Sequence, residues 1–194
     1  MINKSVIAHE LGHAVCGEVQ DGFWAATSLT LETDDNNLAY CHCYQLDVRK
    51  DTVNSRYSKL SEIFNLGGIF GELLFEGAWN PWGSRADLDE FVTANSNSRS
   101  ALKEELDDWF FRDTDPRSYH ACSRKRTTTE RRLFKLDAHD TATRLPELWK
   151  VYLDFCNRID KDEFKRCVAE ISVDGENTVP ASKLKPMLKR VTNG

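Results

Sequence analysis

Residues 9 to 13 read His-Glu-Leu-Gly-His, an H-E-x-x-H pattern in a chain of 194 residues. Because helical residues four apart lie on one face, His9 and His13 can present two imidazole nitrogens to the same metal ion. Glu10 is then turned toward the neighbouring water site and can act as the general base. A catalytic zinc ion keeps three protein ligands and one open position for water. The pattern therefore predicts Zn²⁺ as the cofactor and hydrolysis of peptide bonds as the reaction.

The residues around this pattern predict a helix that is buried on one side. Asn3 or Ser5 can cap its start, and Asp21-Gly22 can end it. The apolar residues that surround the pattern are Val6, Ile7, Leu11, Ala14 and Val15. Their spacing suits a helix that packs one face against the rest of the protein.

Two strand patterns follow at residues 27–32 and 38–46, and the turn-forming residues 33–37 lie between them. Polar and apolar residues alternate in both patterns, which predicts a β-hairpin. A strand beside a zinc site has a use, because an extended peptide substrate can pair with an exposed sheet edge. A purely structural hairpin is an equally open interpretation.

A helix is predicted for residues 53–76, and it contains Gly67, Gly68 and Gly71. Glycine destabilises a helix interior by about 1 kcal/mol relative to alanine, so these glycines need a reason. The missing side chains would let this backbone lie close to the metal-binding helix or to a bound group. We therefore expect the two helices to touch.

The residues alone leave the third metal ligand open. Asp87, Asp89 and Glu90 lie within one turn of a helix predicted to begin near residue 86. Glu72 and Glu76 lie on the glycine-containing helix. Asp87 and Asp89 face nearly opposite directions on a helix, so only one of them can point at the metal. Glu90 shares a face with Asp87 and can instead accept a hydrogen bond from an imidazole N–H.

Three segments, taken in order, resemble the peptidase domain of the FtsH family of AAA-linked zinc proteases. They are residues 6–15 (VIAHELGHAV), 66–77 (LGGIFGELLFEG) and 83–88 (GSRADL), and the resemblance covers about residues 4–112. In that family the aspartate of an Asp-Leu pair is the third zinc ligand. The resemblance therefore implies that Glu10 is catalytic and that zinc is bound by His9, His13 and Asp87.

The FtsH family joins its peptidase to an ATPase, but this chain contains no G-x-x-x-x-G-K-[ST] phosphate loop. We therefore expect an ATP-independent zinc metalloendopeptidase that cleaves flexible or specifically docked protein and peptide substrates. Folded substrates would need a separate unfoldase or adaptor as a partner. Two alternatives stay open. One is an anti-repressor protease of the ImmA type, which also uses His-Glu-Leu-Gly-His, and the other is a non-catalytic adaptor or inhibitor that binds a protein partner.

Other classes of zinc peptidase fit less well. The metzincin pattern needs a third histidine six residues after the second, and Val19 stands at that position. Thermolysin-like enzymes take a glutamate from a following helix, where this chain has its predicted hairpin and Glu32.

The predicted elements and the resemblance together indicate an α+β, mainly α-helical protein, in which the zinc helix packs on the glycine-containing helix beside a small hairpin. We divide the chain into a peptidase core at residues 1–113, a basic linker at 114–144 and a C-terminal helical segment at 145–194. Helices are predicted near residues 130–137, 146–158, 160–171 and 180–191. The most apolar stretch, residues 63–79, is broken by Glu72 and Glu76, so no membrane span is expected. The start of the chain lacks the pattern of a secretion signal, and the expected location is the cytoplasm.

Charge is unevenly distributed along the chain. Residues 1–115 carry 9 Lys and Arg against 20 Asp and Glu, whereas residues 116–144 carry 8 against 3. An acidic catalytic part argues against nucleic acid as its partner, because phosphate binding needs positive charge. The basic residues 124–126, with Arg131 and Arg132, favour a solvated linker surface over a site for nucleic acid or an acidic partner.

Cysteine and histidine residues also occur outside the H-E-x-x-H pattern. The six cysteines are scattered, which favours free thiols. Residues 41–43 read Cys-His-Cys, but in a strand the two cysteines face away from the histidine, so a second metal site there is not favoured. The group that would stabilise an oxyanion is open among Tyr40, His42, His120 and His139.

Overall fold

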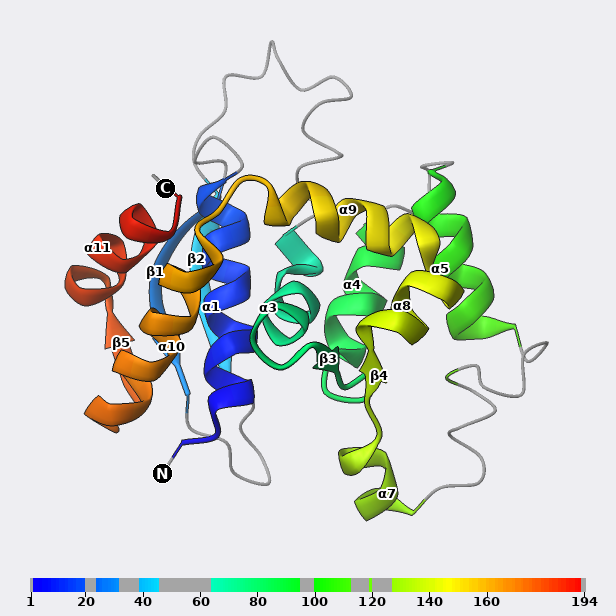
Figure 1. Ribbon diagram of the computed structural model, residues 1–194, viewed down its shortest axis with the longest axis horizontal. Helices are drawn as coiled ribbons and strands as arrows, with labels where there is room; N and C mark the ends of the chain where they lie inside the picture. The colour runs from blue at the N-terminus through cyan, green and yellow to red at the C-terminus, as the bar shows by residue number, and fades with distance from the viewer. Residues whose placement is uncertain are drawn as a thin grey trace, which may run out of the picture.

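The computed structural model describes residues 2–19, 24–31, 39–45, 64–94, 100–112, 119 and 127–192. These residues form a mainly helical protein with a small antiparallel sheet, as the sequence predicted (Figure 1). The helices are α1 (Lys4–Glu18), α3 (Gly67–Glu76), α4 (Arg85–Ala94), α5 (Ala101–Phe111), α7 (Thr128–Leu133), α8 (Ala138–Arg144), α9 (Pro146–Cys156), α10 (Lys161–Asp174) and α11 (Ala181–Thr192). The strands are β1 (Trp24–Thr30), β2 (Tyr40–Gln45), β3 (Ala78–Trp79), β4 (Leu136–Asp137) and β5 (Thr178–Pro180).

Helix α1 forms the centre of the fold. Asn3 caps it, because its side chain accepts a hydrogen bond from the Ser5 N–H at 3.0 Å. The helix packs against α3, α10, α11, β1 and β2. From Ile7 to Gly17 every residue except His9 is buried, so the prediction of a helix buried on one side only is wrong. A central helix that is apolar nearly all round is enclosed because each of its faces meets another element.

Glycines allow α1 and α3 to lie in backbone contact. A Cβ atom at Gly12 would overlap the carbonyl oxygen of Gly67, and one at Gly71 would overlap the carbonyl oxygen of Ala8. Any larger residue at these positions would push the two helices apart. The predicted contact between the two helices is confirmed, and the glycines that cost helix propensity are explained by it.

The three-stranded sheet has the order β2-β1-β5. β1 and β2 are antiparallel, with Thr30 opposite Tyr40 and an irregularity between Ala26 and Ser28. The two predicted strands are therefore confirmed, whereas the turn predicted at residues 33–37 lies outside the described residues. β5 pairs with the other side of β1, which leaves β2 as an edge strand among the described strands.

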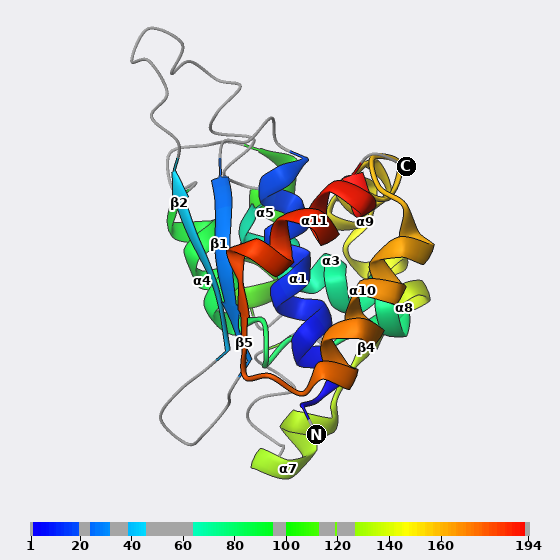
Figure 2. The ribbon, with the colours of Figure 1, turned by 90° about the vertical axis from the view of Figure 1, so that its left-hand side faces the viewer.

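The C-terminal residues pack onto the same core as α1. In Figure 2, α10 and α11 lie against α1, on the side away from the open face of the sheet. Buried side chains from Ile7 to Val191 form one hydrophobic cluster. The boundaries proposed at residues 113 and 144 stay predictions, but the segment 145–194 supplies a strand and two helices to the fold around α1.

Most of the predicted C-terminal helices correspond to α9, α10 and α11. The prediction of a helix at residues 130–137 is wrong at its C-terminal end. Helix α7 ends at Leu133, and residues 136–137 pair with β3 as strand β4. The part of the predicted helix 53–76 that precedes residue 64 lies outside the described residues. No helix in the described segments combines the length and the apolar character needed to cross a membrane.

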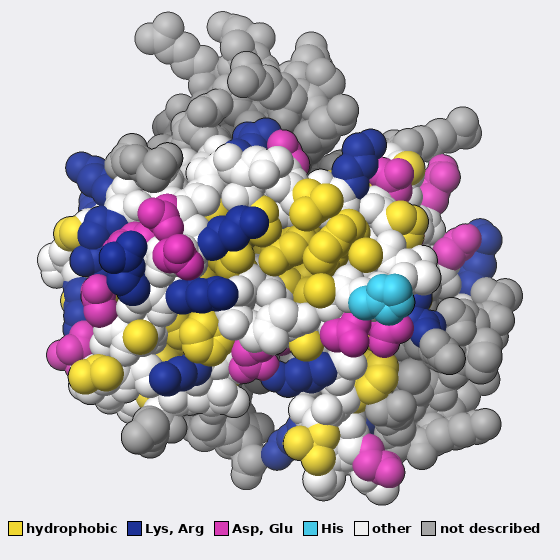
Figure 3. Space-filling model, viewed as in Figure 1, with side chains coloured by type: hydrophobic (Ala, Val, Ile, Leu, Met, Phe, Trp, Pro, Cys, Tyr) yellow, Lys and Arg dark blue, Asp and Glu magenta, His cyan; other side chains and the backbone are white. Residues whose placement is uncertain are grey.

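Helix α9 crosses the top of the molecule in Figure 1 and covers α3 and α5. Its buried side includes Leu148, Tyr152 and Phe155. Its outer side is also partly apolar, since Leu153 is 45 % exposed. Figure 3 shows hydrophobic side chains gathered over this helix.

Candidate metal centre

The side chains of His9, His13 and Asp87 converge on one point. His9 and His13 come from successive turns of α1, and Asp87 comes from the first turn of α4. The His9 Nε2 atom lies 3.0 Å from Asp87 Oδ2, and the His13 Nε2 atom lies 3.3 Å from Asp87 Oδ1. The two Nε2 atoms are 3.4 Å apart. Among the described residues, no other group of His, Cys, Asp and Glu side chains has the spacing of a metal site.

These separations fit a tetrahedral zinc site. With zinc–ligand bonds of about 2.0–2.1 Å, two ligand atoms at a tetrahedral angle lie about 3.3 Å apart. The observed spacings of 3.0, 3.3 and 3.4 Å are close to that value, with His9 nearest to Asp87 Oδ2 and His13 nearest to Asp87 Oδ1. Two imidazoles and one carboxylate are also a donor set that zinc accepts with a fourth position left open.

The outer ring nitrogens of both histidines are engaged. His13 Nδ1 lies 2.8 Å from the carbonyl oxygen of Phe64, which can only accept, so Nδ1 carries the proton. His9 Nδ1 lies 2.7 Å from Glu72 Oε1 and donates to it. Both Nε2 atoms are therefore turned toward Asp87. Such outer partners fix the tautomer and the orientation of metal-binding histidines.

Glu72 lies behind His9, on the far side of the ring from Asp87. It belongs to α3, is buried, and its second oxygen accepts the backbone N–H of Asn80 at 2.8 Å. The sequence suggested Glu90 as a partner of an imidazole, but Glu90 is exposed and Glu72 fills that position. No sequence pattern linked the two residues, because 63 positions separate them.

The other candidates for the third ligand lie elsewhere. Asp89 forms a surface ion pair with Arg85 at 3.5 Å, and Glu76 pairs with Lys135. Of the five acidic candidates, the structure brings Asp87 to the two Nε2 atoms.

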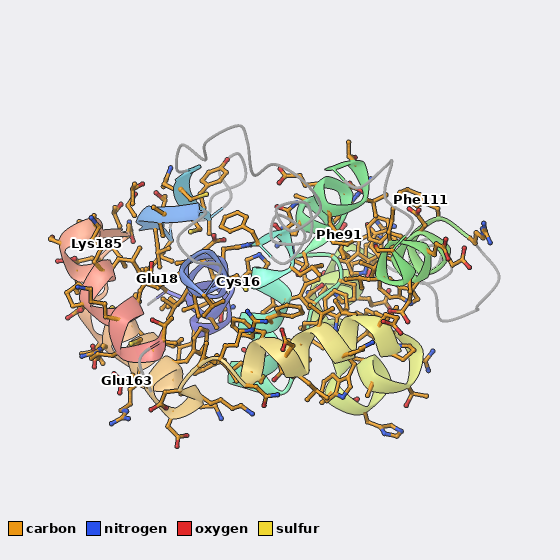
Figure 4. All side chains as sticks on the ribbon, turned by 90° about the horizontal axis from the view of Figure 1, so that it is seen from above. Cys16, Glu18, Phe91, Phe111, Glu163 and Lys185 are labelled. Atoms are coloured by element: carbon orange, nitrogen blue, oxygen red, sulfur yellow. The ribbon has the colours of Figure 1, made fainter. Side chains whose placement is uncertain are left out.

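Gly68 makes room for one histidine ring. A Cβ atom at this position would overlap the imidazole of His9. The glycine therefore allows His9 to lie flat against α3, between Glu72 and Asp87. Figure 4 shows α3 between α1 and α4, the two helices that carry the three converging side chains.

Glu10 lies beside the cluster and is buried, with 5 % of its surface exposed. Its carboxylate accepts a hydrogen bond from the backbone N–H of Cys41, on the edge strand β2. Burial raises the pKa of Glu10, although the nearby imidazoles of His13 and His9 act in the opposite direction. A carboxylate with a raised pKa is a better proton acceptor than an ordinary surface glutamate.

The charges of the cluster depend on one another. Burial alone would lower the pKa of His9, but hydrogen bonds to Asp87 and Glu72 outweigh burial and raise it. His13 shows the same balance, with Asp87 as the main group that raises its pKa. Burial would raise the pKa of Asp87, but His13 and His9 hold it well below its usual range. A metal ion that binds here must displace protons from the imidazoles.

Of the four residues proposed for an oxyanion, the three that the structure describes lie away from the cluster. Tyr40 and His42 lie together on β2, with ring centroids 5.9 Å apart, and His42 Nε2 is 2.8 Å from Thr30 Oγ1. Because neighbouring strand residues face opposite sides, His42 points away from the side on which Cys41 lies near Glu10. His139 is on α8, which packs against α9 and β4, and His120 lies outside the described residues.

The cysteines are free wherever they are described. Free thiols are found at Cys16, Cys41, Cys43, Cys156 and Cys167, and Cys122 lies outside the described residues. This agrees with the expectation of unpaired cysteines for the described part of the chain.

Comparison of the chain with protein-family models, with curated proteins and with solved structures gives no match. The likeness to the FtsH peptidase therefore stays a resemblance of short motifs.

Proposed function

We propose that this protein is a zinc metalloendopeptidase of FtsH-like type, with His9, His13 and Asp87 as zinc ligands and Glu10 as the general base. The observation that carries the proposal is the convergence of two Nε2 atoms and a carboxylate at 3.0–3.4 Å, with both Nδ1 atoms engaged on the other side. Zinc in such a site lowers the pKa of water and polarises a carbonyl oxygen.

Each residue of the site then has one task. Glu10 takes a proton from the attacking water and delivers it to the nitrogen of the leaving amine. Its burial and the hydrogen bond from Cys41 hold the carboxylate in place for both transfers. Glu72 and the carbonyl of Phe64 hold the imidazole rings so that both Nε2 atoms stay turned toward the place beside Asp87 where zinc would bind.

The edge strand β2 supports a peptide as the substrate. The Cys41 N–H of this strand reaches Glu10, so a chain that paired with β2 in extended form would pass directly beside the site. Pairing through the main chain selects for an extended segment rather than for a particular sequence. Flexible or docked protein segments are therefore the proposed substrates, and a separate unfoldase or adaptor is the proposed partner for folded ones. The proposal keeps the cytoplasm as the location.

The first test is the substitution Glu10→Gln. It removes the base but none of the three ligands, so bound zinc should stay at one per chain while cleavage of an unstructured protein such as casein falls by at least about 100-fold. Zinc content by atomic absorption and the rate of casein cleavage measure the two quantities. Equal cleavage by the variant would remove Glu10 from the mechanism. A wild-type protein that holds zinc but cleaves nothing would favour the adaptor or inhibitor instead.

A further inference from the structure

Two successive hydrogen bonds, through Glu72, connect Asn80 with His9 of the candidate metal centre. Its backbone N–H donates to Glu72 Oε2 at 2.8 Å, and the other oxygen of Glu72 accepts from His9 Nδ1 at 2.7 Å. The position of Asn80 therefore affects where the Glu72 carboxylate lies, and through it the orientation of the His9 ring.

Asn80 also shapes the loop that leads into α4. Its side-chain oxygen accepts the N–H groups of Trp82 at 2.8 Å and Gly83 at 3.2 Å. Its backbone carbonyl accepts the N–H of Ser84 at 3.1 Å, immediately before the helix that carries Asp87. One residue thus connects the support of His9 with the entry to the helix of the third candidate ligand.

The remaining donor of Asn80 binds α7. Its Nδ2 group donates to the carbonyl oxygens of Arg132 at 2.8 Å and Arg131 at 3.5 Å, in the last turn of this helix. The Arg131 carbonyl also accepts the N–H of Phe134 at 3.3 Å. Carbonyl groups in the last turn lack the usual partner four residues on, so an external donor is worth more there than along the body of a helix.

Helix α7 lies at the surface of the protein. None of its residues is buried, and Leu133 is 76 % exposed. The Arg131 guanidinium lies 4.7 Å from the centre of the Trp82 ring, and Lys135, two residues after the end of α7, pairs with Glu76. In Figure 1, α7 protrudes from the lower edge of the molecule. The contacts with Asn80, Trp82 and Glu76 join this region to residues 76–82, the segment that leads from α3 to α4.

We propose that Asn80 is a positioning residue through which the docking of α7 sets the geometry, and hence the affinity, of the metal centre. The inference rests on the proposed function in one respect, namely that the centre binds zinc. When α7 is docked, the Asn80 side chain is fixed at both ends and its N–H is held toward Glu72. When α7 undocks, the Nδ2 group of Asn80 loses the carbonyl oxygens to which it donates. The segment from Asn80 to Ser84 is then less constrained, and His9 is less firmly oriented. Partners behind a metal ligand typically change metal affinity by about 10–100-fold.

The substitution Asn80→Asp keeps the hydrogen-bond acceptor of this side chain and removes its donor. Aspartate keeps an oxygen for Trp82 and Gly83 but has no donor for the carbonyl groups of α7. We expect zinc affinity to fall by about tenfold, and the visible absorption of the Co²⁺-substituted protein to change because the ligand geometry changes. An added carboxylate by itself would strengthen binding of a cation, so a loss of affinity cannot come from the new charge.

A second variant acts on α7 without touching Asn80. Thr127 and Glu130 form the capping box that starts the helix, and Thr127→Ala removes the hydroxyl that accepts the N–H of Glu130. Zinc affinity should fall in the same direction as in Asn80→Asp, and the double variant should show less than the product of the two fold-changes. The matched control is Asp160→Ala, which removes the cap of α10 and its bonds to the N–H groups of Asp162 and Glu163. It should lower the melting temperature but leave zinc affinity and the Co²⁺ spectrum unchanged.

The outcomes separate the inference from the proposed function. Wild-type zinc affinity and Co²⁺ spectra in both Asn80→Asp and Thr127→Ala would overturn the role of Asn80 while the metal centre stands. Independent, fully multiplicative losses in the double variant would overturn the connection to α7. A wild-type protein that binds neither Zn²⁺ nor Co²⁺ would overturn the proposed function and the inference together.

Discussion

Two regions of this protein are packed in different ways. Around the metal centre, α1 and α3 meet through glycine backbones, and the groups buried between the elements include the side chains of Glu10, His13 and Glu72. Around α10 and α11, the contacts are made by large apolar side chains such as Phe164 and Leu184. Ion pairs of Arg190 with Glu163 at 2.8 Å and Glu170 at 2.7 Å lie at the surface of that region.

This difference in packing predicts how substitutions in each region affect metal binding and stability. A backbone contact leaves no side chain that can move aside, so a single methyl group near the metal centre must displace a helix. An apolar side-chain contact can relax in part, and its loss costs mainly burial. Changes in the first region should therefore affect metal and fold together, whereas changes in the second should affect stability alone.

The largest effect is expected from Asp87→Ala. It removes the carboxylate that lies 3.0 Å and 3.3 Å from the two Nε2 atoms, so zinc affinity should fall by at least about 100-fold and peptide cleavage should be lost. Isothermal titration with zinc and a casein assay measure these quantities. Asp89→Ala is the matched control two positions away and should change neither. Zinc retained in Asp87→Ala but lost in Glu72→Ala would show that the centre is assembled around the other carboxylate.

Gly71→Ala tests whether the helix contact itself holds the centre together. The new Cβ atom would overlap the carbonyl of Ala8, so α1 and α3 must separate, at a cost of about 3 kcal/mol in the free energy of unfolding. Zinc affinity should fall with it, because His9 and Glu72 lie on the two helices that move. Urea unfolding and zinc titration give the two values. Gly83→Ala, whose nearest contact would be an ordinary 3.6 Å, is the control and should be close to neutral.

Ile171→Val makes the corresponding small change in the C-terminal region. Ile171 is 1 % exposed in α10, and removing one methylene should cost about 0.5–1.5 kcal/mol in the free energy of unfolding. Zinc affinity should equal that of the wild type, because no polar group of the centre is moved. A matching loss of zinc would contradict the division between the two regions.

The smallest effect concerns the stability of the metal-free protein as pH changes. The pKa values of His9 and His13 are raised in the fold, so their stabilising contribution is present below the pKa of the unfolded chain and is lost as pH rises through the folded values. The lowered pKa of Asp87 contributes in the opposite sense, and that part is lost only in strong acid. Metal-free protein should therefore melt at a higher temperature at pH 6 than at pH 8. With saturating zinc the order should reverse, because zinc replaces those protons.

Much of the local structure could be predicted from the sequence. The alternation in residues 27–32 and 38–46 gave β1 and β2, and helical periodicity with caps gave α9, α10 and α11. Three elements had no usable signal because β3, β4 and β5 are only two or three residues long. A segment that short is a strand only because a partner strand lies beside it.

The sequence by itself determined that His9 and His13 lie together, because a helix repeat of 3.6 residues brings positions 9 and 13 to one face whatever surrounds them. It also determined that α3 needs a close neighbour, since glycines in a helix are otherwise costly. Only the tertiary structure decided which acidic residue meets the imidazoles, and that Glu72 and the carbonyl of Phe64 stand behind them. The physical reason is distance along the chain: these partners lie 63 and 51 residues from their histidines, and no local rule relates positions so far apart.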